Sequence, residues 1–473
     1  MVGVLRRVGG LPVVTGAALV TTTAAPVISR RPTPLVVLLV ALVGVVIAGV
    51  VGVVRLARSR GRGRLSTRSL TPAVRDMLLH LSPVLLLTVI FPVVSRRIAH
   101  AQVAGVGLTS LLLASSLTVP WLSQAVCLPL YRAIGHLIAD GDMARIQRRF
   151  CEVWPLTFVQ SLPAIAVFAV PVEIAMRWPP AAFGTYLTLC ALHLAFVQSL
   201  VLVNVGRKRV QWALAWTGYS AALFVAPTAW YLPPLVGLVT QLVPLRRQLR
   251  AARRPVMLAN TDVAVDLVRG TLLGAVLWSD KLFFFLKAGS HFAVTAVFLA
   301  LLPAVLAYNY YFVRLAPVFD RSVGDLRVAM EKEPYRALTV RSRALVAVVE
   351  TSISRTAFAG ALLGLVVTYV TAEVRPRSLP LITAVAVGSW LFMMITVLCY
   401  KLDYIGQSGQ AQILSACHLV GCTLAFLLLP AGASLYVALI VFDVLLFAVA
   451  LHRCLLHWRL SEYTLFWRHA TAW

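Results

Sequence analysis

Long apolar stretches separated by short basic segments make up most of this chain. A helix needs about 20 predominantly apolar residues to cross the hydrocarbon core of a bilayer, and many windows of about that length lack any charge. From residue 77 onward, the pattern predicts twelve membrane-spanning helices. They cover residues 77–95, 103–130, 153–172, 181–205, 210–231, 233–245, 267–288, 293–313, 345–372, 380–400, 411–430 and 434–452. The fold class expected is therefore an all-α polytopic membrane protein.

Two further apolar stretches precede these helices. Val8–Ser29 carries no charge but is rich in glycine and threonine, whereas Pro34–Val54 is strongly apolar. A basic segment with seven arginines and no lysine, Arg55–Arg75, follows them. We therefore expect one or two extra N-terminal spans within residues 1–54 and a basic cytoplasmic linker in residues 55–76.

The composition agrees with a membrane protein and changes how the net charge is interpreted. The chain is 60% hydrophobic and only 13% charged, where a soluble domain carries about 25%. Its formal charge of +26 would suggest nucleic acid in a soluble protein. If residues 55–76 are cytoplasmic, however, 32 of the 43 Lys and Arg residues lie on the cytoplasmic side and seven lie outside. We therefore predict a multi-pass protein of the cytoplasmic membrane with both termini in the cytoplasm, in contact with anionic lipid and not with nucleic acid.

The spacing of the longer loops divides the twelve spans into two sets of six. The two longest predicted cytoplasmic loops, Tyr131–Glu152 and Arg314–Arg343, each follow the second span of a set. Matched loops favour two six-helix bundles related by an axis along the membrane normal, with a substrate path between them. The expected domains are a first bundle at 77–247, a linker at 248–265, a second bundle at 266–452 and a cytoplasmic tail at 453–473.

One predicted span, within Asp266–Gly289, carries more charge than a lipid-facing helix tolerates. A charge near the bilayer centre costs about 3 kcal/mol or more. At 100° per residue, Arg269, Asp280 and Lys287 fall within about 20° of one line, and Lys281 lies about 100° away. We therefore expect Asp280 and Lys281 not to face each other. We interpret Arg269 and Lys287 as interfacial anchors, and the Asp280–Lys281 dipeptide as either cavity-lining or paired with a neighbouring helix.

Aromatic side chains near this charged segment suggest a path for sugars, because the C–H faces of pyranose rings pack on aromatic rings. The same residues also suit the aromatic belt that anchors many membrane helices. The candidate substrate path comprises Asp280, Lys281, Trp278, Phe284, Tyr308, Asn309 and Trp121.

Motifs for catalysis or for metal binding are missing from the sequence. It contains no HExxH, no Walker loop, no GxSxG and no GxGxxG, and none of its seven cysteines forms a CxxC pair. We therefore predict no catalytic residue, no metal site and no cofactor, and we do not expect an enzyme.

Several short motifs occur in the order seen in one transporter family. The stretch Trp278-Ser279-Asp280-Lys281-Leu282-Phe283-Phe284-Phe285 resembles the Trp-x-Asp-Lys-aromatic stretch of Pel-type exopolysaccharide transporters, members of the multidrug/oligosaccharidyl-lipid/polysaccharide exporter superfamily. Tyr400-Lys401-Leu402-Asp403 resembles that family's Tyr-x-Leu-Asp turn, and Glu462-Tyr463-Thr464-Leu465-Phe466 resembles its Glu-Tyr-x-x-Phe tail. The resemblance covers roughly residues 77–467. The extra N-terminal spans, and Ser82-Pro83 in the first core span, depart from the family pattern.

The resemblance implies a carrier that moves a nascent sugar polymer across the cytoplasmic membrane beside a cytoplasmic glycosyltransferase. Three transport alternatives remain open: polymer export, flipping of a lipid-linked oligosaccharide or murein precursor, and cation-coupled drug export. A glycan polymerase would need a large outside loop, whereas every outside loop predicted here is short. A passive scaffold for a synthase, docked through the two long cytoplasmic loops, is the remaining class.

Overall fold

The computed structural model shows a helical protein. It describes residues 77–84, 86–87, 90, 94, 97–289, 292–374 and 378–470. The predicted N-terminal spans Val8–Ser29 and Pro34–Val54 and the basic linker Arg55–Arg75 lie outside the described residues.

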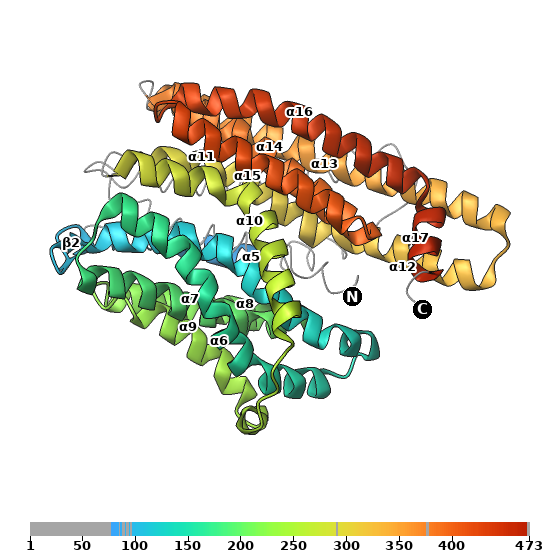
Figure 1. Ribbon diagram of the computed structural model, residues 1–473, viewed down its shortest axis with the longest axis horizontal. Coiled ribbons are helices and arrows are strands. Elements are labelled where there is room, and N and C mark those ends of the chain that lie inside the picture. The colour runs from blue at the N-terminus through green and yellow to red at the C-terminus, as the bar shows by residue number, and fades with distance from the viewer. Residues whose placement is uncertain are drawn as a thin grey trace.

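The described chain begins with helical residues at 77–84, and a two-stranded antiparallel hairpin and a series of helices follow (Figure 1). The first half then comprises β1 (Gln102–Val103), β2 (Val106–Gly107), α5 (Leu108–Asp140), α6 (Met143–Met176), α7 (Pro180–Val205), α8 (Arg209–Val225), α9 (Leu232–Leu242) and the 3₁₀ turns η3 (Val243–Leu245) and η4 (Gln248–Arg253). The second half follows as α10 (Asn260–Ala288), α11 (Val294–Tyr310), the π-helical turn η6 (Tyr311–Leu315), α12 (Ala316–Lys332), α13 (Tyr335–Val374), α14 (Leu379–Ile405), α15 (Ser408–Leu428), α16 (Ala433–Arg459) and α17 (Ser461–Ala470).

Each predicted span from 103–130 onward overlaps one of these helices. Among the described residues, eight helical segments are long and apolar enough to cross a membrane, in α5, α6, α7, the α11–α12 segment, α13, α14, α15 and α16. This confirms an all-α, multi-pass membrane protein. The other three helices that overlap predicted spans, α8, α9 and α10, are shorter or richer in charge.

The predicted boundaries are wrong where polar sequence continues a helix. The loop expected at Tyr131–Glu152 is a tight turn between α5 and α6, in which the Asp142 carboxylate accepts the N–H groups of Ala144 and Arg145 at 2.9 and 3.1 Å. The loop expected at Arg314–Arg343 is mostly helix, in α12 and the first turns of α13. These segments are polar, but they are amphipathic and extend the apolar helices beyond their hydrophobic part.

Other boundaries move for similar reasons. Helix α10 begins at Asn260, inside the predicted linker 248–265, and α16 continues to Arg459, inside the predicted tail. The span expected to start at 103 starts at Leu108, because the hairpin turns at Gly105, whose φ of +82° favours glycine.

The helices of the two halves pack in corresponding ways. Helix α5 contacts α6 and α7 in the first half, as α11 contacts α13 and α14 in the second, and α8 pairs with α9 as α15 pairs with α16. Helices α5, α7, α11 and α14 are largely buried, whereas α6, α13, α15 and α16 lie outside them and expose apolar side chains such as Val170, Leu365 and Leu445. These outer faces are the surface that lipid would cover.

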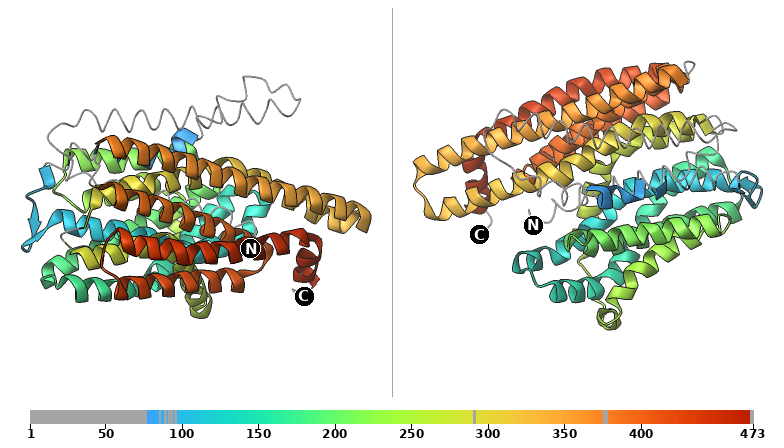
Figure 2. Two further views of the ribbon diagram at one scale, coloured as in Figure 1. Left: turned by 90° about the horizontal axis from the view of Figure 1, so that it is seen from above. Right: turned by 180° about the vertical axis from the view of Figure 1, so that it is seen from behind.

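Helix α10 lies between the two halves in the views of Figures 1 and 2. It packs against α5 and α6 on one side and against α14 and α15 on the other. The charged span singled out in the sequence is therefore a helix that contacts both halves.

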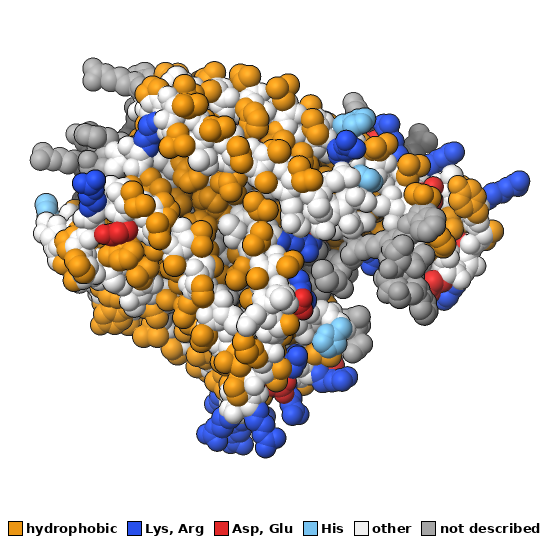
Figure 3. All heavy atoms as spheres, viewed as in Figure 1, with side chains coloured by type: hydrophobic (Ala, Val, Ile, Leu, Met, Phe, Trp, Pro, Cys, Tyr) orange, Lys and Arg blue, Asp and Glu red, His pale blue; other side chains and the backbone are white. Residues whose placement is uncertain are grey.

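Charged side chains gather toward one end of the molecule. Figure 3 shows apolar side chains over the middle, and Lys and Arg side chains at the end where Figure 1 places the α5–α6 turn, the α12–α13 turn, α17 and the α9–α10 connection. The α9–α10 connection carries Arg246, Arg247, Arg250, Arg253 and Arg254. This distribution is typical of a protein whose helices cross a bilayer with basic loops on one side.

Candidate functional site

The site is built on α10, which approaches α5 closely through two glycines one helical turn apart. A Cβ on Gly270 would lie 2.3 Å from Ala125 Cα, and one on Gly274 would lie 2.8 Å from Trp121 Cδ1. This is the small-xxx-small packing that lets membrane helices touch backbone to backbone. The Trp121 indole N–H of α5 also donates a hydrogen bond to the Thr271 carbonyl of α10 at 2.7 Å. The sequence candidate Trp121 thus has a packing role in the α5–α10 contact.

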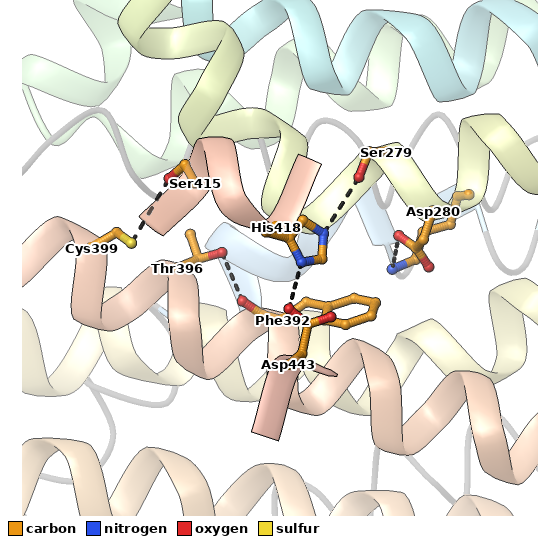
Figure 4. Close-up of polar contacts among 9 residues, drawn as sticks. Ser279, Asp280, Phe392, Thr396, Cys399, Ser415, His418 and Asp443 are labelled. Atoms are coloured by element: carbon orange, nitrogen blue, oxygen red, sulfur yellow. Dashed lines mark hydrogen bonds and ion pairs between the residues drawn. The ribbon is translucent and has the colours of Figure 1, made fainter. Parts of the chain in front are cut away.

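Asp280 and Lys281 form an ion pair with each other, so the prediction that they do not face each other is wrong. The Lys281 Nζ lies 2.9 Å from Asp280 Oδ1, and both side chains are wholly buried (Figure 4). The 100° angle between neighbouring positions holds at Cβ, but the four-carbon Lys side chain is long enough to fold back. The Lys281 Nζ also lies 5.2 Å from the centroid of the Phe392 ring on α14, a cation–π contact.

A second buried pair lies beside the first. His418 on α15 makes a 2.8 Å contact between its Nδ1 and Asp443 Oδ1 on α16, and both side chains are wholly buried. The other ring nitrogen, Nε2, lies 3.4 Å from the Oγ of Ser279 on α10 (Figure 4). The sequence left two alternatives for the charged segment, a cavity lining or a pair with a neighbouring helix. The ion pair of Asp280 is instead with Lys281 of its own helix, and the neighbouring helices α14, α15 and α16 supply the surrounding groups.

Aromatic rings enclose these polar groups. The Phe392 ring packs edge-on against His418 with centroids 4.9 Å apart. Phe284, a sequence candidate, packs edge-on against Tyr436 at 5.7 Å. Trp278 is buried, and its indole N–H has no hydrogen-bond acceptor among the described residues. The structure thus brings Asp280, Lys281 and Phe284 of the candidate path into one buried region with groups from α14, α15 and α16.

The interpretation of Arg269 as an interfacial anchor is wrong. Its guanidinium is buried and donates to the Asp403 carboxylate on α14, which makes an ion pair across two helices. One turn earlier, Asp266 accepts from Arg132 of α5 at 2.5 Å. Lys287, in contrast, is exposed and lies at the other end of α10, where its Nζ donates to the Phe426 carbonyl at 2.5 Å and to the Leu429 carbonyl.

Tyr308 and Asn309 lie in a different environment from Asp280. Tyr308 on α11 packs against Phe312 and Tyr400, with centroids 4.7 and 6.5 Å apart. The Asn309 side chain donates to the Val305 carbonyl of its own helix at 2.7 Å. Nearby, the Tyr400 hydroxyl donates to Gln124 Oε1 of α5 at 2.6 Å, which ties the second half to the first.

Sequence reasoning missed His418, Phe392 and Tyr436. A histidine in an otherwise uncharged span was a usable signal, since Asp443 in the next span had no evident partner. The other two are apolar or aromatic residues among many, and only the packing of α14 and α16 selects them. Among the described residues, no group of three or more His, Cys, Asp or Glu side chains could hold a metal ion.

Comparisons of this chain with protein-family models, with curated proteins and with solved structures find no match. The resemblance to Pel-type exporters therefore stays a prediction from the short motifs quoted above.

Proposed function

We propose that the protein is a membrane transporter that moves a nascent exopolysaccharide across the cytoplasmic membrane. The observation that carries transport is the group of wholly buried ionisable side chains, Asp280, Lys281, His418 and Asp443, where α10 meets the apolar helices α15 and α16. Buried ionisable groups are costly in membrane proteins, where they mark substrate or ion pathways. Two of the four lie on α10, the helix between the two halves, which favours a role in moving the halves.

Two six-helix bundles with twelve core spans, 77–247 and 266–452, are the architecture that we propose. The corresponding packing of α5–α9 and of α11 with α13–α16 supports two parallel repeats. In this arrangement the segment beginning at residue 77 and α10 are the first helices of their bundles. The end rich in Arg and Lys faces the cytoplasm, where a glycosyltransferase would deliver the polymer between the α5–α6 and α12–α13 turns.

The choice of cargo depends on the motif around Trp278 and on the charge of the site. Each of the two buried carboxylates has a cationic or ionisable partner, Lys281 for Asp280 and His418 for Asp443. With two carboxylates for one ammonium group and one imidazole, this set has no surplus positive charge to attract a pyrophosphate. This favours a sugar polymer over a lipid-linked precursor as the substrate.

The first prediction concerns the Asp280–Lys281 pair. In cells that lack their own copy, Asp280→Asn and Lys281→Met are each expected to lower surface polysaccharide by about tenfold or more at matched membrane levels. Either change leaves one buried charge of the pair uncompensated and alters the site on α10. The measurement is surface polysaccharide per cell, normalised to the protein in the membrane fraction.

A matched control uses the same chemistry at an exposed position within α12, away from the α12–α13 turn. Asp325→Asn changes an exposed side chain and is expected to leave export at the wild-type level. Undiminished surface polysaccharide in both α10 variants would overturn the role given to the pair.

A further inference from the structure

We propose that Asp280, Lys281, His418 and Asp443 together form a proton-binding site, and that its occupancy sets how α10 sits against α15 and α16. These four residues are called the charge cluster below. The inference rests on the transport function proposed above and names the ion that would drive it.

Charge balance is the first reason. The charge cluster holds two carboxylates, one ammonium group and one imidazole, and all four side chains are wholly buried. With a neutral imidazole its net charge is −1, and with one added proton its net charge is zero. An apolar, membrane-embedded surrounding penalises the uncompensated charge, so the charge cluster favours binding one proton.

The geometry around His418 accommodates both protonation states. When the imidazole is neutral, its Nδ1–H donates to Asp443 Oδ1 at 2.8 Å, and Nε2 accepts from the Ser279 hydroxyl at 3.4 Å. When the imidazole is protonated, Nε2–H donates to the Ser279 Oγ, because a serine hydroxyl can change from donor to acceptor by rotating. Both protonation states of the imidazole can therefore keep their hydrogen bonds to Asp443 and Ser279 in the observed arrangement.

Among the described residues, Asp443 is the charged side chain that contacts His418. From α10, Asp280 and Lys281 flank Ser279, and Lys287 reaches carbonyls at the far end of α15. From α14, the Phe392 ring packs on the imidazole, and Cys399 meets α15 one turn earlier through Ser415 at 3.9 Å. The other titratable groups near His418 are Asp443 and Tyr436 on α16 and Cys422 on α15. Tyr436 and Cys422 each interact electrostatically with Asp280.

The same helix links the proton to the other half of the molecule. Ser279 and Asp280 lie about one and a half turns beyond Gly274, which with Gly270 fixes α10 against α5. Deprotonation of His418 would leave two carboxylates, Asp280 on α10 and Asp443 on α16, with the one ammonium group of Lys281 to compensate them. Repulsion between α10 and α16 would then favour a different position of α10, and a rigid helix carries that change to α5.

The test measures the protonation of His418 directly. Full-length protein labelled with ¹⁵N in its histidine rings is placed in lipid nanodiscs, and nitrogen NMR distinguishes imidazolium from neutral imidazole between about pH 5 and pH 8. His418 is identified by the signal lost in His418→Gln, or by the signal displaced in Ser279→Ala if the first variant does not fold. We expect the His418 signal to change reversibly between the imidazolium and the neutral form within this pH range.

Two variants separate the proposal from its alternatives. Asp443→Asn is expected to lower the imidazolium fraction at about pH 7 by about tenfold or more, since it removes the carboxylate that compensates the charge. His193→Gln is the matched control, because His193 is buried in the first half but bonds to the Tyr219 hydroxyl and the Leu189 carbonyl and has no acid partner. It is expected to leave the His418 signal unchanged.

A neutral His418 throughout this pH range in the wild type overturns the proposal. So does loss of the imidazolium signal when sodium chloride replaces potassium chloride, which would assign the charge cluster to sodium. Neither measurement needs a cargo. An imidazolium at His418 in a protein that moves no glycan would contradict the proposed function alone, while a neutral His418 in an active exporter would contradict this inference alone.

Discussion

Replacing Gly270 by alanine is expected to destroy the close contact between α5 and α10 and to remove most of the folded protein. The added Cβ would lie 2.3 Å from Ala125 Cα and 2.6 Å from Ala125 N, both backbone atoms that cannot move aside as a side chain can. Overpacking of this kind costs about 3 kcal/mol, or more where backbones must separate. The measurement is the yield of monodisperse protein in mild detergent, together with its thermal unfolding midpoint.

Gly364 supplies the matched control. It also lies inside a membrane-spanning helix, α13, but a Cβ there meets no atom within 4 Å. Alanine at Gly364 is expected to leave the protein as stable as the wild type or slightly more so, because alanine favours a helix over glycine by about 1 kcal/mol. Equal stability of the Gly270→Ala and Gly364→Ala proteins would contradict the direct backbone contact between the two halves.

Removing one partner of the Arg269–Asp403 pair is expected to cost about 3–5 kcal/mol, because the other buried charge then loses its ion-pair partner. The single variants are Arg269→Met and Asp403→Leu. The double variant with Met and Leu is expected to recover most of the loss, since a buried ion pair can often be replaced by apolar side chains of similar size.

The four proteins form a double-mutant cycle, measured by thermal unfolding in nanodiscs. An interaction energy well above the ~0.5 kcal/mol scatter for independent sites is expected. Two single variants whose losses simply add in the double variant would show that Arg269 and Asp403 do not act as a pair.

Hydrophobic pattern predicts most of the fold but not how its helices meet. Apolar length alone located the helices α5–α11 and α13–α16, though not all of their ends, because a helix that crosses a membrane must bury its backbone polar groups within itself. The pattern could not tell that residues 314–332 form the helical extension η6–α12, since polar residues end an apolar stretch without ending the helix.

The sequence predicted the residues of the candidate site that stand out by their charge, but not the pairs that form between helices. Asp280 and Lys281 stood out because charge is rare in a span, and their burial agrees with that signal. The pairing of Arg269 with Asp403, 134 positions away, and that of His418 with Asp443 depend on which helices are neighbours. A single sequence has no periodicity that records such contacts. The position of Arg269 near the end of its predicted span therefore did not predict its environment, because its ion-pair partner comes from α14.

The most direct test of the transporter proposal is movement of glycan by the purified full-length protein in liposomes. Labelled fragments of the host's own exopolysaccharide are added outside, and the label retained inside is measured against empty liposomes. We predict that the wild type and Asp325→Asn accumulate the fragments, while Asp280→Asn accumulates about a tenth as much or less at equal protein content. No accumulation by the wild type above empty liposomes, or equal accumulation by Asp280→Asn, would contradict a transporter that works through the buried charges of α10.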